Sequence, residues 1–145
     1  MAVLQIREIG DPVLRTETRA VEEVNDKTRR LLKDMAETMY AADGVGLAAP
    51  QVGVSKRIIV VDIGEGLLSL VNPEIIDTSG EVCGEEGCLS IPERNKKVSR
   101  AEQIVVEALD EEGNQVKIEA EGLLARVLQH EIDHLDGILF IDKAE

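Results

Sequence analysis

Apolar positions follow a helical period in two stretches of this chain. In the first, a stripe with a spacing near 3.6 residues predicts a helix that begins after Asn25, a suitable N-cap, and ends at Gly44; the stripe consists of Leu32, Met35 and Met39. The second helix is expected from about Gly122 to His134, and Gly137 follows as its C-terminal stop.

Other segments have the composition and alternation of strands. The β-branched segment KRIIVVDI (56–63) predicts a buried strand, and QIVVEAL, DEEGN and QVKIEA predict a hairpin with Val116, Ile118 and Ala120 on one face. Residues 69–92 are expected as short extended pieces interrupted by Pro and Gly, and 44–53 as an uncharged loop. Strands outnumber helices and do not alternate with them. We therefore expect an α+β fold, with mostly antiparallel sheets around a central helix and an N-terminal helix.

Size and charge narrow the class of protein. The 145 residues show no repeat and no linker, which favours one domain, and a 43% apolar composition with few aromatics predicts an aliphatic core. The net charge of -13 argues against a surface for DNA, RNA or anionic membranes. The basic segment ERNKKVSR (93–100) is interpreted as a solvated loop or as a rim that touches substrate. With no signal-peptide pattern, no membrane-length apolar run and two cysteines that form no disulfide framework, a cytoplasmic protein is expected.

The only two histidines lie together in LQHEIDHLDG (128–137). His130 and His134 are four residues apart with Glu131 between them, so on a helix both imidazoles share one face. This is the HExxH pattern of divalent-metal sites, most often zinc. Two imidazoles do not complete such a site, and a third ligand is therefore expected.

The third ligand is expected upstream of the helix. The pattern HExxHxxGxxH would place it where this chain has Phe140, and too few residues follow for another packed helix. Cys88 is preferred to Cys83, because Gly87 allows close backbone approach and the extended LSIP that follows can lie along the helix. Cys83 is better explained as a small buried apolar residue.

Three motifs in order resemble those of peptide deformylases: GVGLAAPQ (44–51), EGCLS (86–90) and QHEIDHLDG (129–137). The similarity extends to GDPVLR near the start and GLLARVLQHE before the histidines. The resemblance implies an enzyme that removes the formyl group from N-formylmethionine on new polypeptides and releases formate. Two rival readings are a small HExxH aminopeptidase or amidase, and a non-enzymatic metal site closed by a fourth ligand such as Cys83.

The resemblance also assigns roles to single residues. It makes Cys88, His130 and His134 the metal ligands, Glu131 the general base and acid, and Gln51 and the Leu89 backbone N–H the oxyanion donors. Glu131 shares a helix flank with Leu124, Val127 and Leu128, where dehydration would raise its pKa. Fe²⁺ is implied as the physiological metal, with Zn²⁺, Ni²⁺ or Co²⁺ as substitutes. The residues implied in substrate binding are Val45, Gly46, Glu86, Gly87, Leu123 and Val127.

The charged residues around these motifs leave alternatives open. Arg100 and Glu86 either pair to shape the Cys88 loop, as the motif favours, or are unrelated surface charges. Asp133 and Asp136 either orient the histidines or face water. The Arg126 stem is expected to border the pocket, with its head in solvent.

The resemblance finally bears on boundaries and partners. Relatives continue past the LFID segment (139–142), expected as a strand, into a C-terminal helix implicated in ribosome docking, whereas this sequence stops at Glu145. We therefore expect 1–145 to be a single catalytic domain without that helix and without ribosome association through it. The expected partners are N-formylmethionyl peptides of nascent chains, with no direct DNA binding and no membrane.

Overall fold

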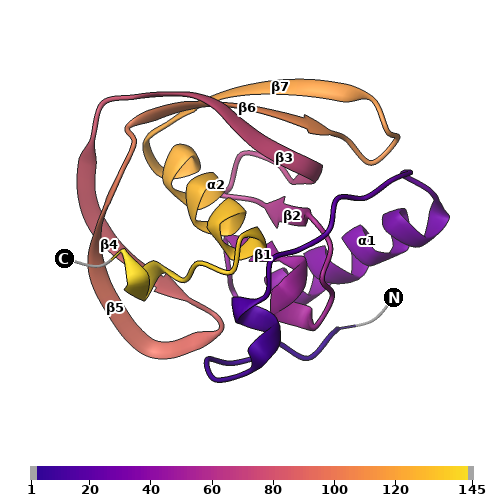
Figure 1. Ribbon diagram of the computed structural model, residues 1–145, viewed down its shortest axis with the longest axis horizontal. Coiled ribbons are helices and arrows are strands. Elements are labelled where there is room, and N and C mark those ends of the chain that lie inside the picture. The colour runs from indigo at the N-terminus through magenta and orange to yellow at the C-terminus, as the bar shows by residue number, and fades with distance from the viewer. Residues whose placement is uncertain (1–2, 144–145) are drawn as a thin grey trace.

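The computed structural model describes residues 3–143, apart from the side chain of Glu93. Two helices, α1 (Asp26–Ala41) and α2 (Gly122–Leu135), pack on two antiparallel sheets (Figure 1). The larger sheet has the order β1-β2-β3-β6-β7, and β4 and β5 form a separate pair. The strands are β1 (Gly46–Ala48), β2 (Ile58–Val61), β3 (Leu68–Ser79), β4 (Val82–Cys88), β5 (Ile91–Arg100), β6 (Gln103–Leu109) and β7 (Gln115–Glu121). Three short 3-10 helices complete the fold: η1 (Pro12–Arg15), η2 (Ala49–Val52) and η3 (Phe140–Asp142).

Strand β2 lies between the two helices and is buried on both faces. Ile59 and Val61 belong to the apolar cluster that includes Leu128 and Leu135 of α2, whereas Ile58 and Val60 belong to the cluster of α1. Burial on both faces explains why this segment is a continuous β-branched run and not an alternating one. The predicted strand and the α+β fold are confirmed, with α2 across the concave side of the larger sheet (Figure 1).

Helix α1 begins as predicted but ends differently. The Asn25 side chain accepts a hydrogen bond from the Thr28 backbone N–H at 3.1 Å, as an N-cap should. The left-handed residue at the other end is Asp43, with φ of 56°, and the Gly44 N–H donates to the Met39 carbonyl at 2.9 Å. Asp tolerates this conformation better than most residues. Gly44 is small for a different reason: a Cβ there would lie 2.7 Å from a Leu89 methyl carbon.

The region between the helices is more regular than its sequence indicates. The predicted loop 44–53 contains β1 and η2, and the short pieces predicted over residues 69–92 are β4, the start of β5 and, before them, one twelve-residue strand, β3. This strand contains Pro73, which lacks an N–H. It is tolerated because the register with β6 shifts between Val71 and Glu74. Asn72, with φ of 52°, uses its side-chain amide to bind both backbone groups of Val21.

Strands β4 and β5 form a hairpin arm that stands beside α2 (Figure 1). The basic segment 93–100, interpreted as a solvated loop or as a rim that touches substrate, is part of β5. Its Val98 packs in a third apolar cluster with Leu14, Ile91, Leu139 and Phe140. The LFID segment, predicted as a strand, instead forms η3, where the Asp142 carboxylate accepts from the Leu139 N–H.

The second helix, α2, follows the predicted hairpin without an intervening loop. Strands β6 and β7 pair as the predicted antiparallel hairpin, with Val106 opposite Ile118, and α2 begins at Gly122 (φ 61°). Gly137 follows α2 with φ of 74°, as the sequence predicts for its stop. None of the helices in the described part of the chain is long and apolar enough to cross a membrane.

The single tyrosine gives a spectroscopic test of this packing. The Tyr40 hydroxyl donates to the Asp62 carboxylate at 2.6 Å, and this hydrogen bond raises the tyrosine pKa above 10.0. An ultraviolet titration should therefore have its midpoint above 10, and Asp62→Ala should move it back toward that value, because the acceptor and its charge are lost. Identical midpoints in the two proteins would show that this contact is not formed in solution.

Candidate metal centre

Helix α2 and the hairpin arm bring the three predicted ligands together. His130 and His134 lie on one face of α2, and Cys88 is the last residue of β4. Their potential ligand atoms all lie within 4.8 Å of one another, and Cys88 Sγ is 3.3 Å from His134 Nε2. Cys83, at the other end of β4, is not part of this group and is exposed, so the prediction that it is a buried apolar residue is wrong.

The geometry and charge of this group fit a divalent cation. A tetrahedral ion with ordinary bond lengths separates a thiolate sulfur from an imidazole nitrogen by about 3.6 Å, close to the separation seen here. Burial, and then the charge of His130, hold the pKa of His134 well below its usual value, which favours the neutral form that binds metals. Burial also disfavours protonated His130, but hydrogen bonds with Cys88 and Glu86 outweigh it and raise that pKa to about 10.

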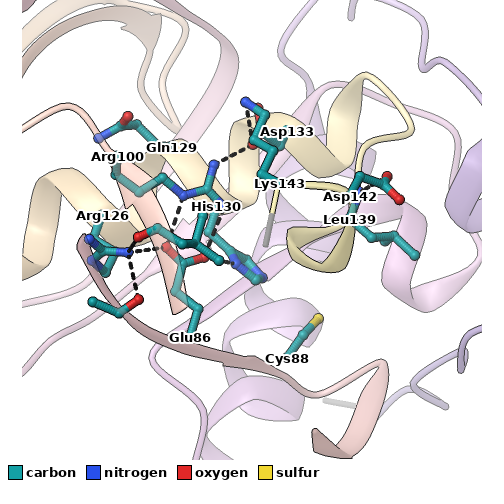
Figure 2. Close-up of polar contacts among 12 residues, drawn as sticks. Glu86, Cys88, Arg100, Arg126, Gln129, His130, Asp133, Leu139, Asp142 and Lys143 are labelled. Carbon is teal, nitrogen blue, oxygen red and sulfur yellow. Dashed lines mark hydrogen bonds and ion pairs between the residues drawn. The ribbon is translucent and has the colours of Figure 1, made fainter. Parts of the chain in front are cut away.

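A single carboxylate, Glu86, connects the arm to the helix (Figure 2). It accepts two hydrogen bonds from Arg100, both 2.8 Å, and it lies 2.9 Å from His130 Nδ1. The Arg126 guanidinium completes the set. Burial alone would raise the pKa of Glu86, but the hydrogen bonds from Arg100 and His130 lower it to about 2. Because Nδ1 of His130 is occupied, its Nε2 is left for a metal.

Glu86 and Arg126 have larger roles than the sequence indicates. The Arg100–Glu86 pair is formed, but the contact of Glu86 with His130 was not predicted. The head of Arg126, expected in solvent, instead donates to the carbonyl oxygens of Val82 (2.8 Å) and Val98 (3.0 Å) on the hairpin arm. These carbonyls come from strands distant in sequence, so no local pattern reveals them.

The two aspartates near the histidines act indirectly. Asp133 binds the Arg100 guanidinium and the Lys143 ammonium group, the latter at 3.1 Å (Figure 2). Asp136 pairs with Arg57 at 2.9 Å. Within residues 3–143, neither carboxylate forms a hydrogen bond or ion pair with the side chain of His130 or His134. Asp133 therefore acts on the site through the Arg100–Glu86 pair.

Glu131 is buried beside the histidines, against the backbone of β1. Only 4% of its surface is exposed, and within residues 3–143 its Oε1 has no hydrogen-bond partner. Burial raises the pKa of this carboxyl to about 7. A Cβ at Gly46 would lie 2.6 Å from Glu131 Oε2 and 2.9 Å from a Val127 methyl, so glycine is needed at position 46. A carboxyl with a pKa near 7 can both accept and donate a proton.

Gln51 directs its amide nitrogen at the cysteine loop. Its Oε1 accepts from the Ala48 N–H at 2.9 Å, which leaves Nε2 3.5 Å from Cys88 Sγ and 3.1 Å from the Ser90 hydroxyl. Ser90, fully buried, is a further site residue that the sequence analysis did not single out. Its place in the EGCLS motif is the signal that could have found it.

A cavity of about 370 Å³ opens in front of these residues. The predicted residues Val45, Gly46, Glu86, Gly87, Leu89, Leu123 and Val127 all line it. Leu123 and Val45 are 55% and 45% exposed, so the cavity has apolar walls at its mouth. Its lining also includes Asp43 and Glu85, which were not predicted, and Arg94 and Asn95 from the basic segment 93–100, for which a rim that touches substrate was one of the two interpretations.

An aromatic ring covers the far side of the site. Phe140, 1% exposed, stacks on His130 with ring centroids 5.9 Å apart and an interplanar angle of 28°. This is the position at which the extended HExxH pattern would carry a third histidine. Here the ring supports the imidazole by packing.

Fold and site together are typical of a metal-dependent hydrolase of the HExxH type. Residues 3–145 match the family model for polypeptide deformylase, and the chain belongs to this family. It is 63% identical to the peptide deformylase of Halothermothrix orenii, over 99% of this chain and 94% of that protein, and 56% identical to that of Carboxydothermus hydrogenoformans, over 100% and 95%. The crystal structure of peptide deformylase from Thermotoga maritima superposes with a TM-score of 0.98 at 44% identity, covering 100% of this chain and 99% of that one.

Members of this family are metal-dependent enzymes that remove the N-formyl group from nascent polypeptides. The resemblance drawn from the three motifs is therefore confirmed, and so is the predicted enzymatic activity. The rival readings, an aminopeptidase or a non-enzymatic metal protein, lose their support.

The central role of Glu86 predicts a metal-binding defect. Glu86→Gln should weaken metal affinity about 10- to 100-fold, because His130 loses the carboxylate that orients it. It should also lower the free energy of unfolding by about 3–5 kcal/mol, because two largely buried arginines lose their partner. Chelator competition and denaturant unfolding measure the two effects. Glu119→Gln, an exposed carboxylate on β7, is the control. Equal metal affinity in Glu86→Gln and the wild type would contradict this role.

Proposed function

We propose that Cys88, His130 and His134 hold the metal ion of this deformylase and that Glu131 is its general base and acid. The observation that carries the proposal is the convergence of the three ligand atoms within 4.8 Å beside a buried carboxyl group. The orphan oxygen of Glu131 and its pKa of about 7 support a proton-transfer role.

The bound ion would activate a water molecule and polarise the formyl carbonyl oxygen. Glu131 accepts the proton from the attacking water on its carboxylate and delivers it to the nitrogen of the departing methionine, so the products are formate and a free amine. Gln51 Nε2 and the backbone N–H of Leu89 donate hydrogen bonds to the oxygen that becomes negative. Each such donor is typically associated with a 10²- to 10³-fold effect on kcat.

The cavity supports a binding mode for the substrate. We propose that Leu123 and Val127 contact the methionine side chain and that backbone groups around Val45, Gly46 and Gly87 pair with the extended peptide. Glu86 also lines the cavity, but its carboxylate is engaged by Arg100, Arg126 and His130. It is therefore proposed as a positioning residue for His130 and not as a substrate contact.

The metal ion proposed for the cell is Fe²⁺. One thiolate and two imidazoles suit Fe²⁺ and Zn²⁺ alike, and Ni²⁺ or Co²⁺ are proposed as active substitutes. The proposed partners are N-formylmethionyl peptides in the cytoplasm, handled by one catalytic domain within residues 1–145. The net charge of -13 speaks against DNA as a partner.

Two variants test the assigned roles by formate release from N-formyl-Met-Ala-Ser. Glu131→Gln should reduce turnover by about 10²- to 10⁴-fold while metal content stays normal, because proton transfer is lost but the ligands remain. Cys88→Ala should lose metal and activity together. Cys83→Ala, on the same strand, is the matched control and should retain both. Wild-type turnover in Glu131→Gln would rule out its role as the base.

The metal itself is tested by reconstitution. Protein prepared without oxygen and loaded with Fe²⁺ should turn over faster than the Zn²⁺ form and lose activity in air, since Fe²⁺ is oxidised. The Ni²⁺ form should keep its activity in air. A Zn²⁺ form as active as the Fe²⁺ form would remove the case for iron.

A further inference from the structure

Three of the charged side chains that line the cavity bind or face an opposite charge. Glu86 and Arg126 bind each other in the wall. Glu85 lies directly opposite Lys97 in the register of β4 and β5, so these two side chains are cross-strand neighbours of opposite charge. Apart from the buried Glu131, the lining then leaves Arg94 and Asp43.

Arg94 is the cation in this lining that remains available. It lies on β5. Its side chain is exposed, and this side chain makes no hydrogen bond or ion pair with any side chain or backbone group that the structure describes. The other arginine of the lining, Arg126, has its donors occupied by Glu86 and by backbone carbonyls. An unoccupied guanidinium at the mouth of a substrate cavity is suited to bind a carboxylate, with two parallel hydrogen bonds.

We propose that Arg94 is a specificity-determining residue that favours formylmethionyl peptides with an acidic side chain at the second or third position. This proposal rests on the proposed function in one respect: the peptide substrate must occupy this cavity. Arg94 and Cys88 line the same cavity, and each extended residue spans about 3.3–3.6 Å, so we place Arg94 within reach of the first residues of a peptide bound there.

Two sources of negative charge oppose the attraction of Arg94 for an acidic peptide. Asp43 lines the same cavity but has a short side chain at the end of α1, whereas an arginine reaches far from its strand. The net charge of -13 repels acidic peptides, but the Debye length at 0.1 M salt is about 10 Å, so distant charges count little. The nearby guanidinium should therefore determine the preference.

The test compares kcat/KM for N-formyl-Met-Ala-Glu-Ser, its Gln analogue and its Lys analogue, and for the series with the variable residue second. At low salt the wild type should prefer Glu over Gln by about twofold to fivefold in at least one series, the range of an exposed ion pair. The preference should lie mainly in KM, because the contact forms before the chemical step, and it should shrink at high salt.

Variants separate the local effect of Arg94 from the overall charge. Arg94→Ala should bring the Glu to Gln ratio to about one, and Arg94→Glu should invert it in favour of Lys. Lys117 is exposed on β7 and lies outside the cavity lining. Lys117→Glu changes the net charge by the same amount as Arg94→Glu and should leave the ratio unchanged.

Three outcomes would overturn the proposal. These are an unchanged ratio in Arg94→Ala, an equal shift in Lys117→Glu, or a wild-type preference for Lys that Asp43→Asn removes. The neutral peptide N-formyl-Met-Ala-Ser runs beside each series. Loss of the reaction itself with that peptide in the wild type would count against the proposed function, whereas the Glu to Gln ratio tests only Arg94.

Discussion

The site depends on one buried carboxylate surrounded by cations. Glu86 on the hairpin arm binds Arg100 from the neighbouring strand, Arg126 and His130 from α2 (Figure 2). Without these partners a carboxylate 5% exposed would be costly to bury. Without Glu86, in turn, Arg126 would still bind the Val82 and Val98 carbonyls of the arm, but the side chain that joins both arginines to His130 would be gone, and Cys88, two residues along, would lose its fixed relation to the two histidines. Fold and function meet in this contact.

The apolar packing gives α2 its fixed position. One side of this helix packs on the larger sheet through Leu128 and Leu135. At the C-terminal end of the helix, the Thr18 hydroxyl donates a hydrogen bond to the Leu135 carbonyl at 2.7 Å. The same helix carries Glu131 into the narrow space beside Gly46. The burial that stabilises the fold is thus also the burial that raises the pKa of Glu131 toward 7.

Local patterns in the sequence predicted the helices, β2 and the β6–β7 hairpin, and the motifs predicted which residues would meet at the site. Three of the failures involve contacts between distant segments. Pro73 argues against a continuous strand until a register shift accommodates it. Arg126 resembles a surface residue until the carbonyls of β4 and β5 are in place. The Glu86–His130 contact spans 44 residues, so no local spacing indicates it.

The proposed ligands come from a hairpin arm and from a helix, and this has a consequence for the lifetime of the holoenzyme. Cys88 belongs to the β4–β5 pair and His134 to the helix, 46 residues further along the chain. If the proposed ligands hold the ion, it acts as a reversible cross-link, and by the loop-closure entropy of a disulfide over such a span it would restrain the denatured chain by about 4 kcal/mol. Escape of the ion and detachment of the arm then become a single event. Metal exchange should accordingly be as slow as that opening, and each lost ion leaves a chain that unfolds more easily.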